Sequence, residues 1–270
     1  MGFSEQQRRD LIDGYLRALE LERKPPEFDL LKALIRRHVA TFSFSSVGPR
    51  LGDELPLDLE SLYQRIVLRR RGGYCFEQNG LFFEVLEDLG FAPRLCLARV
   101  IDNEDSHPGL THRISIVSLD GEDWIVDVGF GSCGPRIPVP ISGADVNDGD
   151  RIFRVFEPRA GELHNQTLKD GAYFSLYRFE LLRYGQADCD VGHFYSHKHP
   201  DAAFVNHLVV SRILEEEIRS LRNRDYRLIR GSDAFDRAIE NGRQLQQLLD
   251  QEFDIEVTEA EAGQLFEQSG

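Results

Sequence analysis

The chain has 270 residues, of which 41% are hydrophobic, and its formal net charge at pH 7 is -14. A chain of this length and composition is expected to form two or three subdomains around a sizeable core. The negative charge argues against a general nucleic-acid or anionic-membrane surface, because either would need a basic footprint.

The N-terminal residues indicate where the protein works. Residues 1–6 lack the basic and apolar regions of a secretory signal, and the chain contains no run of about 18 apolar residues. We therefore expect a cytoplasmic protein without a membrane span. In that compartment Cys75, Cys96, Cys133 and Cys189 are expected to be free thiols, one of them reactive and the others packing residues.

The first ninety residues have the apolar spacing of helices. Ser4 is expected to cap a helix that ends before Pro25. Asp29 is expected to cap a second helix, on which His38 lies at the surface or the edge of the core. Asp58 begins a third helix. Together with the helix described next, these segments predict a helical bundle over residues 1–90.

A glycine-rich turn introduces the most informative cysteine. Gly72 and Gly73 allow a sharp turn, and we expect a helix to open at Cys75 and run to Gly90. The positive end of that helix, and Arg71 nearby in the sequence, would lower the pKa of the Cys75 thiol. A free cysteine is often simply a small buried hydrophobic residue, but this turn favours a reactive one.

After Gly90 the pattern alternates with the period of strands. We expect an all-β barrel over residues 91–190 and a mixed α/β lid over residues 191–270. The expected barrel strands are residues 94–100, 111–119, 123–128, 151–157, 163–168 and 172–182. In the lid, residues 204–213 and 226–229 are expected as strands, residues 233–253 as a helix, and the tail from Thr258 as helical.

A hairpin turn predicts how two polar residues meet. If Asp120 and Gly121 form the turn, then the two residue numbers of every cross-strand pair add up to 241. Ile116, for example, faces Ile125. His112 and Asp127 then share one face of the hairpin, a diagonal step of about 7–8 Å apart. A carboxylate on an apolar face needs a hydrogen-bonding partner.

These three side chains predict a nucleophilic site. Asp127 would orient His112, and His112 would take the proton of the Cys75 thiol, as in other cysteine-histidine-aspartate triads. The simpler interpretation is that His112 and Asp127 only satisfy each other inside the barrel. The nearby Cys75 motif favours the triad.

Three segments resemble the signature segments of the arylamine N-acetyltransferases. They are residues 70–79 (RRGGYCFEQN), Thr111-His112, and residues 126–131 (VDVGFG). Residues 89–91 and 98–100, and His199-Pro200 with Phe204 and Asn206, also resemble that family. The resemblance implies an α+β fold with an N-terminal helical bundle, a central β-barrel and a C-terminal α/β lid, around a cysteine-protease-like Cys-His-Asp core.

The resemblance also implies residue roles. Cys75 would accept the acyl group, His112 would be its base, and Asp127 would orient His112. The cofactor-binding residues would be Gly129, Phe130, Gly131, Ser132 and Phe204, with Phe130 forming a wall of the acyl pocket. Glycines there would let backbone amides approach a ligand closely.

The implied reaction is ping-pong transfer of an acetyl group from acetyl-CoA, as acyl donor, through acetyl-Cys75 to an arylamine, an arylhydrazine or a related nitrogen acceptor. The implied partners are that small acceptor and coenzyme A, with no nucleic acid, membrane or metal, in a monomer or homodimer. The sequence leaves open whether the role is detoxification of foreign amines or a biosynthetic step.

The chain departs from the family at several positions. Phe44-Ser45-Ser46 stands where Phe-Glu-Asn is common, and Arg113 stands where an apolar residue is common. Between His199-Pro200 and Phe204, where the family often has a serine, this chain has Asp201-Ala202-Ala203. None of these residues belongs to the triad. They bear on the lid and on acceptor preference.

Other functions use the same triad. With water as acceptor the protein would be a thioesterase or amidase, with a tethered amine a macrolactam-forming amide synthase, and with a peptide lysine a transglutaminase-like enzyme. The chain length and residues 126–131 favour the acetyltransferase. A scaffold without activity is disfavoured because all three triad residues are present.

A metal site is the remaining class to weigh. One short segment contains four residues of types that can bind zinc: Cys189, His193, His197 and His199. Their spacing matches no regular ligand pattern, and we expect the stretch to be a loop leading to the lid.

Overall fold

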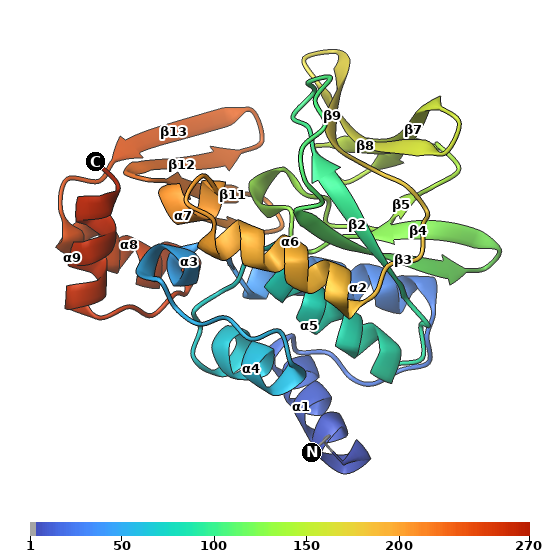
Figure 1. Cartoon of the computed structure of the whole chain (residues 1–270), viewed down its shortest axis with the longest axis horizontal. Coiled ribbons are helices and arrows are strands. Elements are labelled where there is room, and N and C mark those ends of the chain that lie inside the picture. Colours follow the sequence, from blue (N-terminus) through green and yellow to red (C-terminus); the bar gives the residue numbers. More distant parts are fainter. Residues whose placement is uncertain (1–3) are drawn as a thin grey trace.

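The chain folds into the α+β arrangement implied above, as the computed structural model of residues 4–270 shows (Figure 1). Residues 1–3, which belong to the stretch expected to lack a secretory signal, lie outside the described residues. The N-terminal helices are α1 (Glu5–Ala18), α2 (Phe28–Thr41), α3 (Val47–Leu51), α4 (Leu59–Tyr63) with its π-helical continuation η1 (Gln64–Leu68), and α5 (Cys75–Asp88).

The helical bundle packs around apolar stripes of α1, α2, α4 and α5. Its first helix begins as expected, because the Ser4 side chain and the Gln7 side chain each bond the other's backbone N–H. The Asp58 carboxylate likewise accepts a bond of 3.0 Å from the Ser61 N–H and starts α4. Two of the three expected helix starts are thus confirmed.

The second helix corrects two expectations. It begins at Phe28 after Glu27, so Asp29 lies inside its first turn and pairs with Lys32 at 2.8 Å instead of capping the helix. His38 is fully buried, not peripheral. Its two ring nitrogens lie 2.7 Å from the Tyr15 hydroxyl and 2.8 Å from Gln78 Oε1, so hydrogen bonds satisfy it inside the bundle.

The middle of the chain forms an eight-stranded antiparallel sheet that curls into a nearly closed barrel. Its order is β5 (Val139–Pro140), β4 (Glu122–Val126), β3 (His112–Leu119), β2 (Arg94–Val100), β9 (Ala172–Phe179), β8 (Glu162–Lys169), β7 (Ile152–Arg159) and β6 (Val146–Asn147). Inward residues of these strands form their own apolar core. Within residues 4–270, no helix combines the length and the apolar character needed to cross a membrane.

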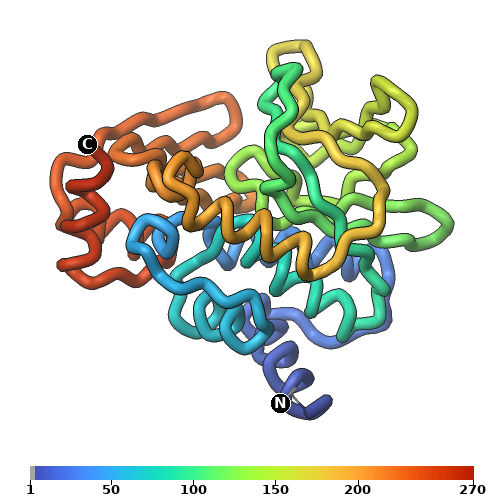
Figure 2. The backbone as a smooth tube through the Cα atoms, viewed as in Figure 1, coloured from blue at the N-terminus to red at the C-terminus, as the bar shows by residue number. Residues whose placement is uncertain are grey.

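The C-terminal part forms a second sheet that reaches back to the bundle. Its order is β1 (Phe44–Ser45), β10 (Val209–Ile213), β11 (Ile218–Arg222), β12 (Asp225–Arg230) and β13 (Asp233–Ala238). The helices of this part are α6 (Gln186–Lys198), α7 (Ala203–Asn206), α8 (Gly242–Phe253) and α9 (Glu259–Gln268). Figure 2 shows the C-terminal end of the chain beside the loop that carries α3. The boundaries at residues 90 and 190 stay a prediction.

The lid differs from expectation in three segments, of which the first is strand β11, which was not expected. Residues 203–206 form α7, not strand, because the Asn206 side chain bonds the Ala202 carbonyl oxygen at 3.0 Å and closes a helical turn. Residues 233–238 form β13, not helix, and all six are exposed, so no apolar face marks the strand in the sequence. The helix begins only after Asn241, whose side chain caps it.

The stretch expected as a loop before the lid is helix α6. Its buried face consists of polar or small residues, so it lacks the apolar periodicity that predicts a helix. The Asp188 carboxylate bonds the Gly185 N–H at 2.8 Å and supports the first turn. Figure 1 shows α6 lying across α5, the helix that begins at Cys75.

Candidate active site

Cys75 is the first residue of α5, as expected, and the turn before it admits only glycine. Gly72 has a φ of 65°, and a Cβ there would lie 2.6 Å from the Ser43 carbonyl oxygen. The Cys75 side chain is buried, and its Sγ lies 3.4 Å from the Thr111 carbonyl oxygen. The helix start therefore holds the thiol against the beginning of β3.

The β3–β4 hairpin has the register that its Asp-Gly turn predicts, with Ile116 opposite Ile125. This register brings His112 and Asp127 together across one face. His112 Nε2 and Asp127 Oδ2 are 2.8 Å apart, and the two side chains are 2% and 0% exposed. The expected proximity of the two residues is therefore present.

The second oxygen of Asp127 is also fully bonded. Oδ1 accepts hydrogen bonds of 2.9 Å from Asn79 Nδ2 and 2.9 Å from the Gly129 N–H. Asn79 Oδ1 in turn accepts a bond of 2.9 Å from the Val128 N–H. Burial alone would raise the pKa of Asp127, but His112, Asn79 and Gly129 together lower it. The carboxylate is thus held ionised and fixed in orientation.

The His112 imidazole lies between this carboxylate and the thiol. Burial alone would lower the pKa of His112, but Asp127, helped by the nearby Cys75, raises it to about 10. The rings of Phe130 and Tyr177 pack on the imidazole with centroid distances of 5.1 and 4.9 Å. These contacts leave the ring one orientation, facing both Asp127 and Cys75. Such an arrangement can generate a nucleophilic thiolate.

A cavity of about 400 Å³ opens over the thiol. Its walls include Cys75 and His112 and every residue expected from the resemblance to contact the cofactor: Gly129, Phe130, Gly131, Ser132 and Phe204. Strands and loops of the barrel supply one wall, and α6, α7 and β11 supply the other. The structure therefore brings all these residues to one cavity, which is large enough for an acyl group and a small aromatic ring.

At two lining positions, Gly129 and Phe204, the local packing explains the residue type. A Cβ on Gly129 would lie 2.6 Å from Asn79 Nδ2 and 2.9 Å from Cys75 Cα, so a larger residue would push the loop away from the thiol. Phe204 packs on Phe44 and Tyr74 with ring centroids 5.6 and 5.2 Å apart. The lid is thereby joined to the turn that carries Cys75.

Some functional residues were not found by sequence reasoning. Asn79 was only part of a motif, although its position one helical turn after Cys75 signals that both face the same side of α5. The charged residues of the cavity, Asp102, Asp201 and Arg222, carry no motif at all. They come from separate segments that only the fold brings together.

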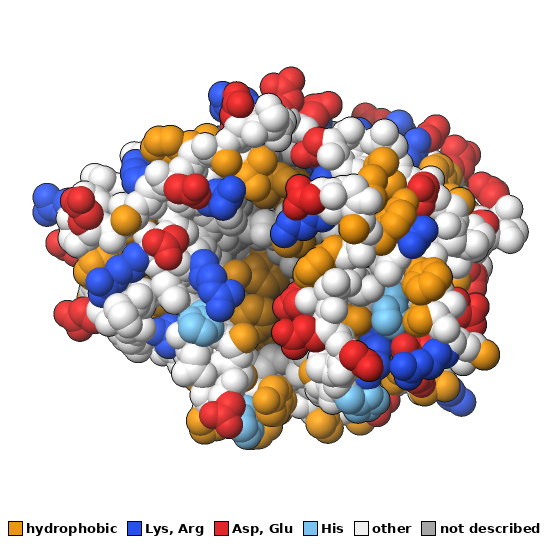
Figure 3. Space-filling model, turned by 90° about the horizontal axis from the view of Figure 1, so that it is seen from above, with side chains coloured by type: hydrophobic (Ala, Val, Ile, Leu, Met, Phe, Trp, Pro, Cys, Tyr) orange, Lys and Arg blue, Asp and Glu red, His pale blue; other side chains and the backbone are white. Residues whose placement is uncertain are grey.

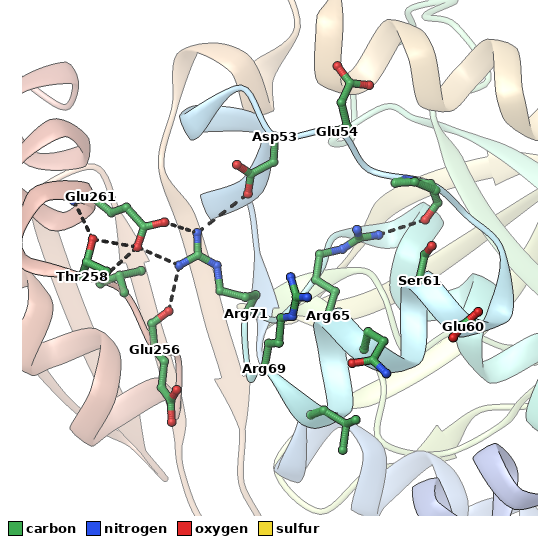
Figure 4. A pocket seen from close by; sticks show the side chains of 14 residues that line it. Asp53, Glu54, Glu60, Ser61, Arg65, Arg69, Arg71, Glu256, Thr258 and Glu261 are labelled. Carbon is green, nitrogen blue, oxygen red and sulfur yellow. Dashed lines mark hydrogen bonds and ion pairs between the residues drawn. The ribbon is translucent and has the colours of Figure 1, made fainter.

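The expected influence of Arg71 on Cys75 is replaced by a different contact. The Arg71 guanidinium points to the C-terminal segment, where it donates to Glu261 at 2.8 and 3.1 Å and to the Glu256 carbonyl oxygen at 2.9 Å (Figure 4). Arg71 therefore joins the turn to the segment around α9. It does not form part of the cavity over Cys75.

A larger cavity, of about 1050 Å³, includes Arg71 in its wall. Figure 4 shows the side chains that line it. Arg65, Arg69 and Arg71 line it together with several carboxylates. No residue of the expected triad lines it. Arg65 reaches inward to Glu77 at 2.5 Å, and Glu77 accepts the Tyr74 N–H at 3.1 Å, so this wall supports the start of α5 from behind.

The histidines considered as metal ligands have other partners. His193 bonds the Tyr74 hydroxyl through Nδ1 and donates from Nε2 to the Leu55 carbonyl oxygen at 2.8 Å. His197 donates to the His193 carbonyl oxygen at 2.6 Å, and His199 stacks on a tyrosine ring. In the part of the chain that the structure describes, no three His, Cys, Asp or Glu side chains are arranged to hold a metal ion.

The chain is similar to known proteins of one family. The family described as "N-acetyltransferase" matches residues 27–262. The arylamine N-acetyltransferase of Escherichia coli is 36% identical over 202 residues, which cover 70% of this chain and 67% of that protein. The solved arylamine N-acetyltransferase of Salmonella typhimurium has a TM-score of 0.90 and 29% identity, covering 95% of this chain and 98% of that one. The Mycobacterium marinum enzyme in complex with CoA has a TM-score of 0.88 and 26% identity over 95% of this chain and 98% of that one.

Proposed function

The chain belongs to the arylamine N-acetyltransferase family, and from this membership we propose that Cys75, His112 and Asp127 carry its reaction. The protein transfers an acetyl group from acetyl-CoA to an arylamine, an arylhydrazine or a related nitrogen acceptor. The observation that carries the proposal is the bonded His112–Asp127 pair, with its 2.8 Å separation, beside a buried thiol in one cavity. The three side chains have the chemistry of a nucleophile, a base and an orienting carboxylate.

In the first half-reaction, Cys75 attacks the thioester. His112, whose pKa Asp127 raises to about 10, holds the proton of the thiol while Sγ forms a bond to the carbonyl carbon of acetyl-CoA. The tetrahedral intermediate collapses by breaking the bond to the coenzyme sulfur, which leaves with the proton returned by His112. The products are acetyl-Cys75 and free coenzyme A.

In the second half-reaction, the amine replaces the coenzyme in the same cavity. Its nitrogen attacks the carbonyl carbon of acetyl-Cys75 while His112 accepts a proton from that nitrogen. The bond between the carbonyl carbon and Sγ then breaks, and the proton returns to the thiol. Aromatic amines suit this step because they are neutral, and therefore nucleophilic, near pH 7.

Residues around the three side chains have supporting roles in the proposed reaction. Asn79 and the Gly129 N–H keep Asp127 charged and oriented, so that Asp127 can stabilise a protonated His112. Phe130 and Phe204 are apolar walls for the acetyl group and the aromatic ring. The loop of residues 129–132 offers backbone groups to the pantetheine arm. The Mycobacterium marinum relative solved in complex with CoA supports coenzyme A as a ligand.

The cellular setting and assembly stay predictions. We expect the protein to act in the cytoplasm, as a monomer or homodimer, on small molecules and without nucleic acid. Size-exclusion chromatography with light scattering of the purified chain measures the assembly.

The test follows free coenzyme A with a thiol reagent, with acetyl-CoA as donor and with or without 4-methoxyaniline. Release that depends on the amine, together with recovery of the acetylated amine, is the expected result. Equal release without the amine would instead identify a thioesterase that uses water. No release in either sample would contradict the choice of acyl donor.

Two cysteine variants locate the acetyl group. Cys75→Ala should abolish amine-dependent release and the acetylated form of the protein in intact mass spectra. The matched control is Cys96→Ala, which removes a buried barrel thiol whose pKa burial raises to about 12 and which lies outside the cavity. A fully active Cys75→Ala protein would overturn the assignment of the nucleophile.

A further inference from the structure

The turn after β2 holds a carboxylate at the mouth of the cavity. Asp102 and Asn103 have φ values of 46° and 64°, which residues other than glycine rarely adopt. The turn is pinned to β9, because the Asn103 N–H donates to the Ser175 carbonyl oxygen at 2.7 Å and the Ser175 N–H donates to Asn103 Oδ1 at 3.1 Å. Strained backbone of this kind persists only where the surroundings fix it. Asp102 is therefore held in place.

The Asp102 carboxylate lacks a partner of its own. It lines the cavity over Cys75 and is exposed, and among residues 4–270 no hydrogen bond contributes to its pKa. Burial, followed by the charge of Glu104, raises its pKa, and Arg222 opposes this only in part. The carboxylate is exposed, and no other side chain of the described residues neutralises it, so a cationic group in the cavity can pair with it.

The rim carries more negative than positive charge. Asp201, at the start of the lid, is a second carboxylate on the cavity wall, and Arg222 from β11 is the one arginine or lysine among the described lining residues. Figure 3 shows a hollow with hydrophobic side chains at its floor and both acidic and basic side chains around its border. Asp102, Asp201 and Arg222 together sum to one negative charge.

We propose that this rim selects the charge of the acceptor, with Asp102 favouring arylamines that carry a cationic group remote from the reacting nitrogen. The inference rests on the proposed function, since it concerns the acceptor of acetyl-Cys75. The reacting nitrogen must reach Cys75 at the floor, so a substituent at the far end of the ring points to the rim. There a positive group gains attraction from Asp102 and Asp201, and a carboxylate meets repulsion.

The test uses three acceptors that differ only in the remote charge. They are 4-ethylaniline, which is neutral, 2-(4-aminophenyl)ethylammonium, and 3-(4-aminophenyl)propanoate; methylene groups insulate the charge from the reacting nitrogen. The measured quantity is kcat/KM for each acceptor, divided by the value for 4-ethylaniline. For the unmodified chain at low ionic strength, we expect the cationic acceptor to exceed the anionic one by about fivefold or more.

Asp102→Asn removes the charge and keeps the turn, because asparagine also tolerates positive φ. It should lower the cation-to-anion ratio by about threefold or more. The matched control is Asp170→Asn, an exposed aspartate with φ of 50° in the β8–β9 turn that does not line the cavity. The cation-to-anion ratio of kcat/KM for Asp170→Asn should equal that of the unmodified chain.

A second variant, with an expected effect opposite to that of Asp102→Asn, tests the proposal further. Arg222→Gln removes the opposing charge and should raise the cation-to-anion ratio. Equal ratios in the unmodified chain, Asp102→Asn and Arg222→Gln would overturn the inference, as would a preference for the anionic acceptor. Failure of the proposed function would look different, because then 4-ethylaniline itself would not be acetylated by any of these proteins.

Discussion

The buried His112–Asp127 pair is stable because both oxygens of the Asp127 carboxylate accept hydrogen bonds. An unpaired buried carboxylate would be costly, but here Asp127 accepts bonds from His112, Asn79 and the Gly129 N–H. The same contacts that make burial tolerable also orient the imidazole toward Cys75. Stability and the proposed reaction therefore depend on one set of hydrogen bonds.

This coupling predicts a pH dependence of stability that involves His112. Its pKa in the fold, about 10, lies above its ordinary value of 6.5. Proton binding therefore favours the folded state: the stabilisation is fully present below pH 6.5 and is lost as the pH rises through about 10. In Asp127→Asn the partner charge is gone, and burial favours neutral His112. Urea unfolding at intervals from pH 6 to pH 10 should show the two proteins differing most at pH 6 and converging toward pH 10.

The activity of Asp127→Asn is a second measurement on the same protein. Asp127→Asn should lower kcat by about 10³- to 10⁴-fold, the loss seen when a triad loses its orienting carboxylate. Stability curves that run parallel from pH 6 to pH 10 would contradict the pairing of His112 with Asp127. Full activity would contradict the role of the carboxylate.

The proximity of His112 and Asp127 could be predicted from the sequence because both residues belong to one hairpin. The Asp-Gly turn fixes the register of one hairpin, and that register alone places His112 beside Asp127. Asn79 and Asp102 could not be assigned in this way. Their roles depend on how α5 packs on the hairpin and on which segments form the cavity rim, and neither follows from local spacing.

Among the helices and strands, those with a clear apolar pattern were predicted and those without one were not. Strand β2 has the expected bounds, and α5 begins at the expected residue. Helix α6 was missed because its buried face is built from His193, His197, Gly192, Cys189 and Ser196. Strand β13 was missed because all its residues are exposed. Propensity and periodicity carry little information where burial does not select apolar side chains.

The close packing of α6 on α5 depends on a glycine. A Cβ on Gly192 would clash with the Leu110 carbonyl oxygen and lie 2.7 Å from Phe76 Cζ, next to Cys75. Gly192→Ala should therefore destabilise the protein by about 1–3 kcal/mol, the usual effect of overpacking. Urea unfolding midpoints measure this. Because Phe76 adjoins the nucleophile, we also expect a lower kcat.

A second helical glycine supplies the control. A Cβ on Gly263, in α9, would meet nothing within 4 Å. Gly263→Ala should raise stability by about 0.5–1 kcal/mol, because alanine loses less backbone entropy in a helix. If both variants were equally stable, the tight contact between α6 and α5 would be refuted.

The cavity lies where the three parts of the molecule meet. The bundle supplies Cys75, the barrel supplies His112 and the 129–132 loop, and the lid supplies Phe204 and Arg222. No part carries the complete set, so the relative placement of the bundle, barrel and lid controls the reaction. Contacts that join distant segments, such as Arg71 with Glu261, therefore matter for activity although they lie outside the cavity.

The charge of the whole molecule predicts how salt affects the first half-reaction. The net charge of -14 repels a donor that carries several phosphate charges, and Arg222 opposes that repulsion only at the mouth of the cavity. Raising the ionic strength from about 0.01 M to 0.1 M shortens the screening length from about 30 Å to about 10 Å, which removes the long-range repulsion and leaves closer contacts largely intact. The kcat/KM for acetyl-CoA should therefore rise by about two- to fivefold over this range. The kcat/KM for 4-nitrophenyl acetate, an uncharged donor, should stay constant over the same range of ionic strength. A fall in kcat/KM for acetyl-CoA would mean that attraction by the rim, not repulsion by the whole surface, governs the approach of the donor.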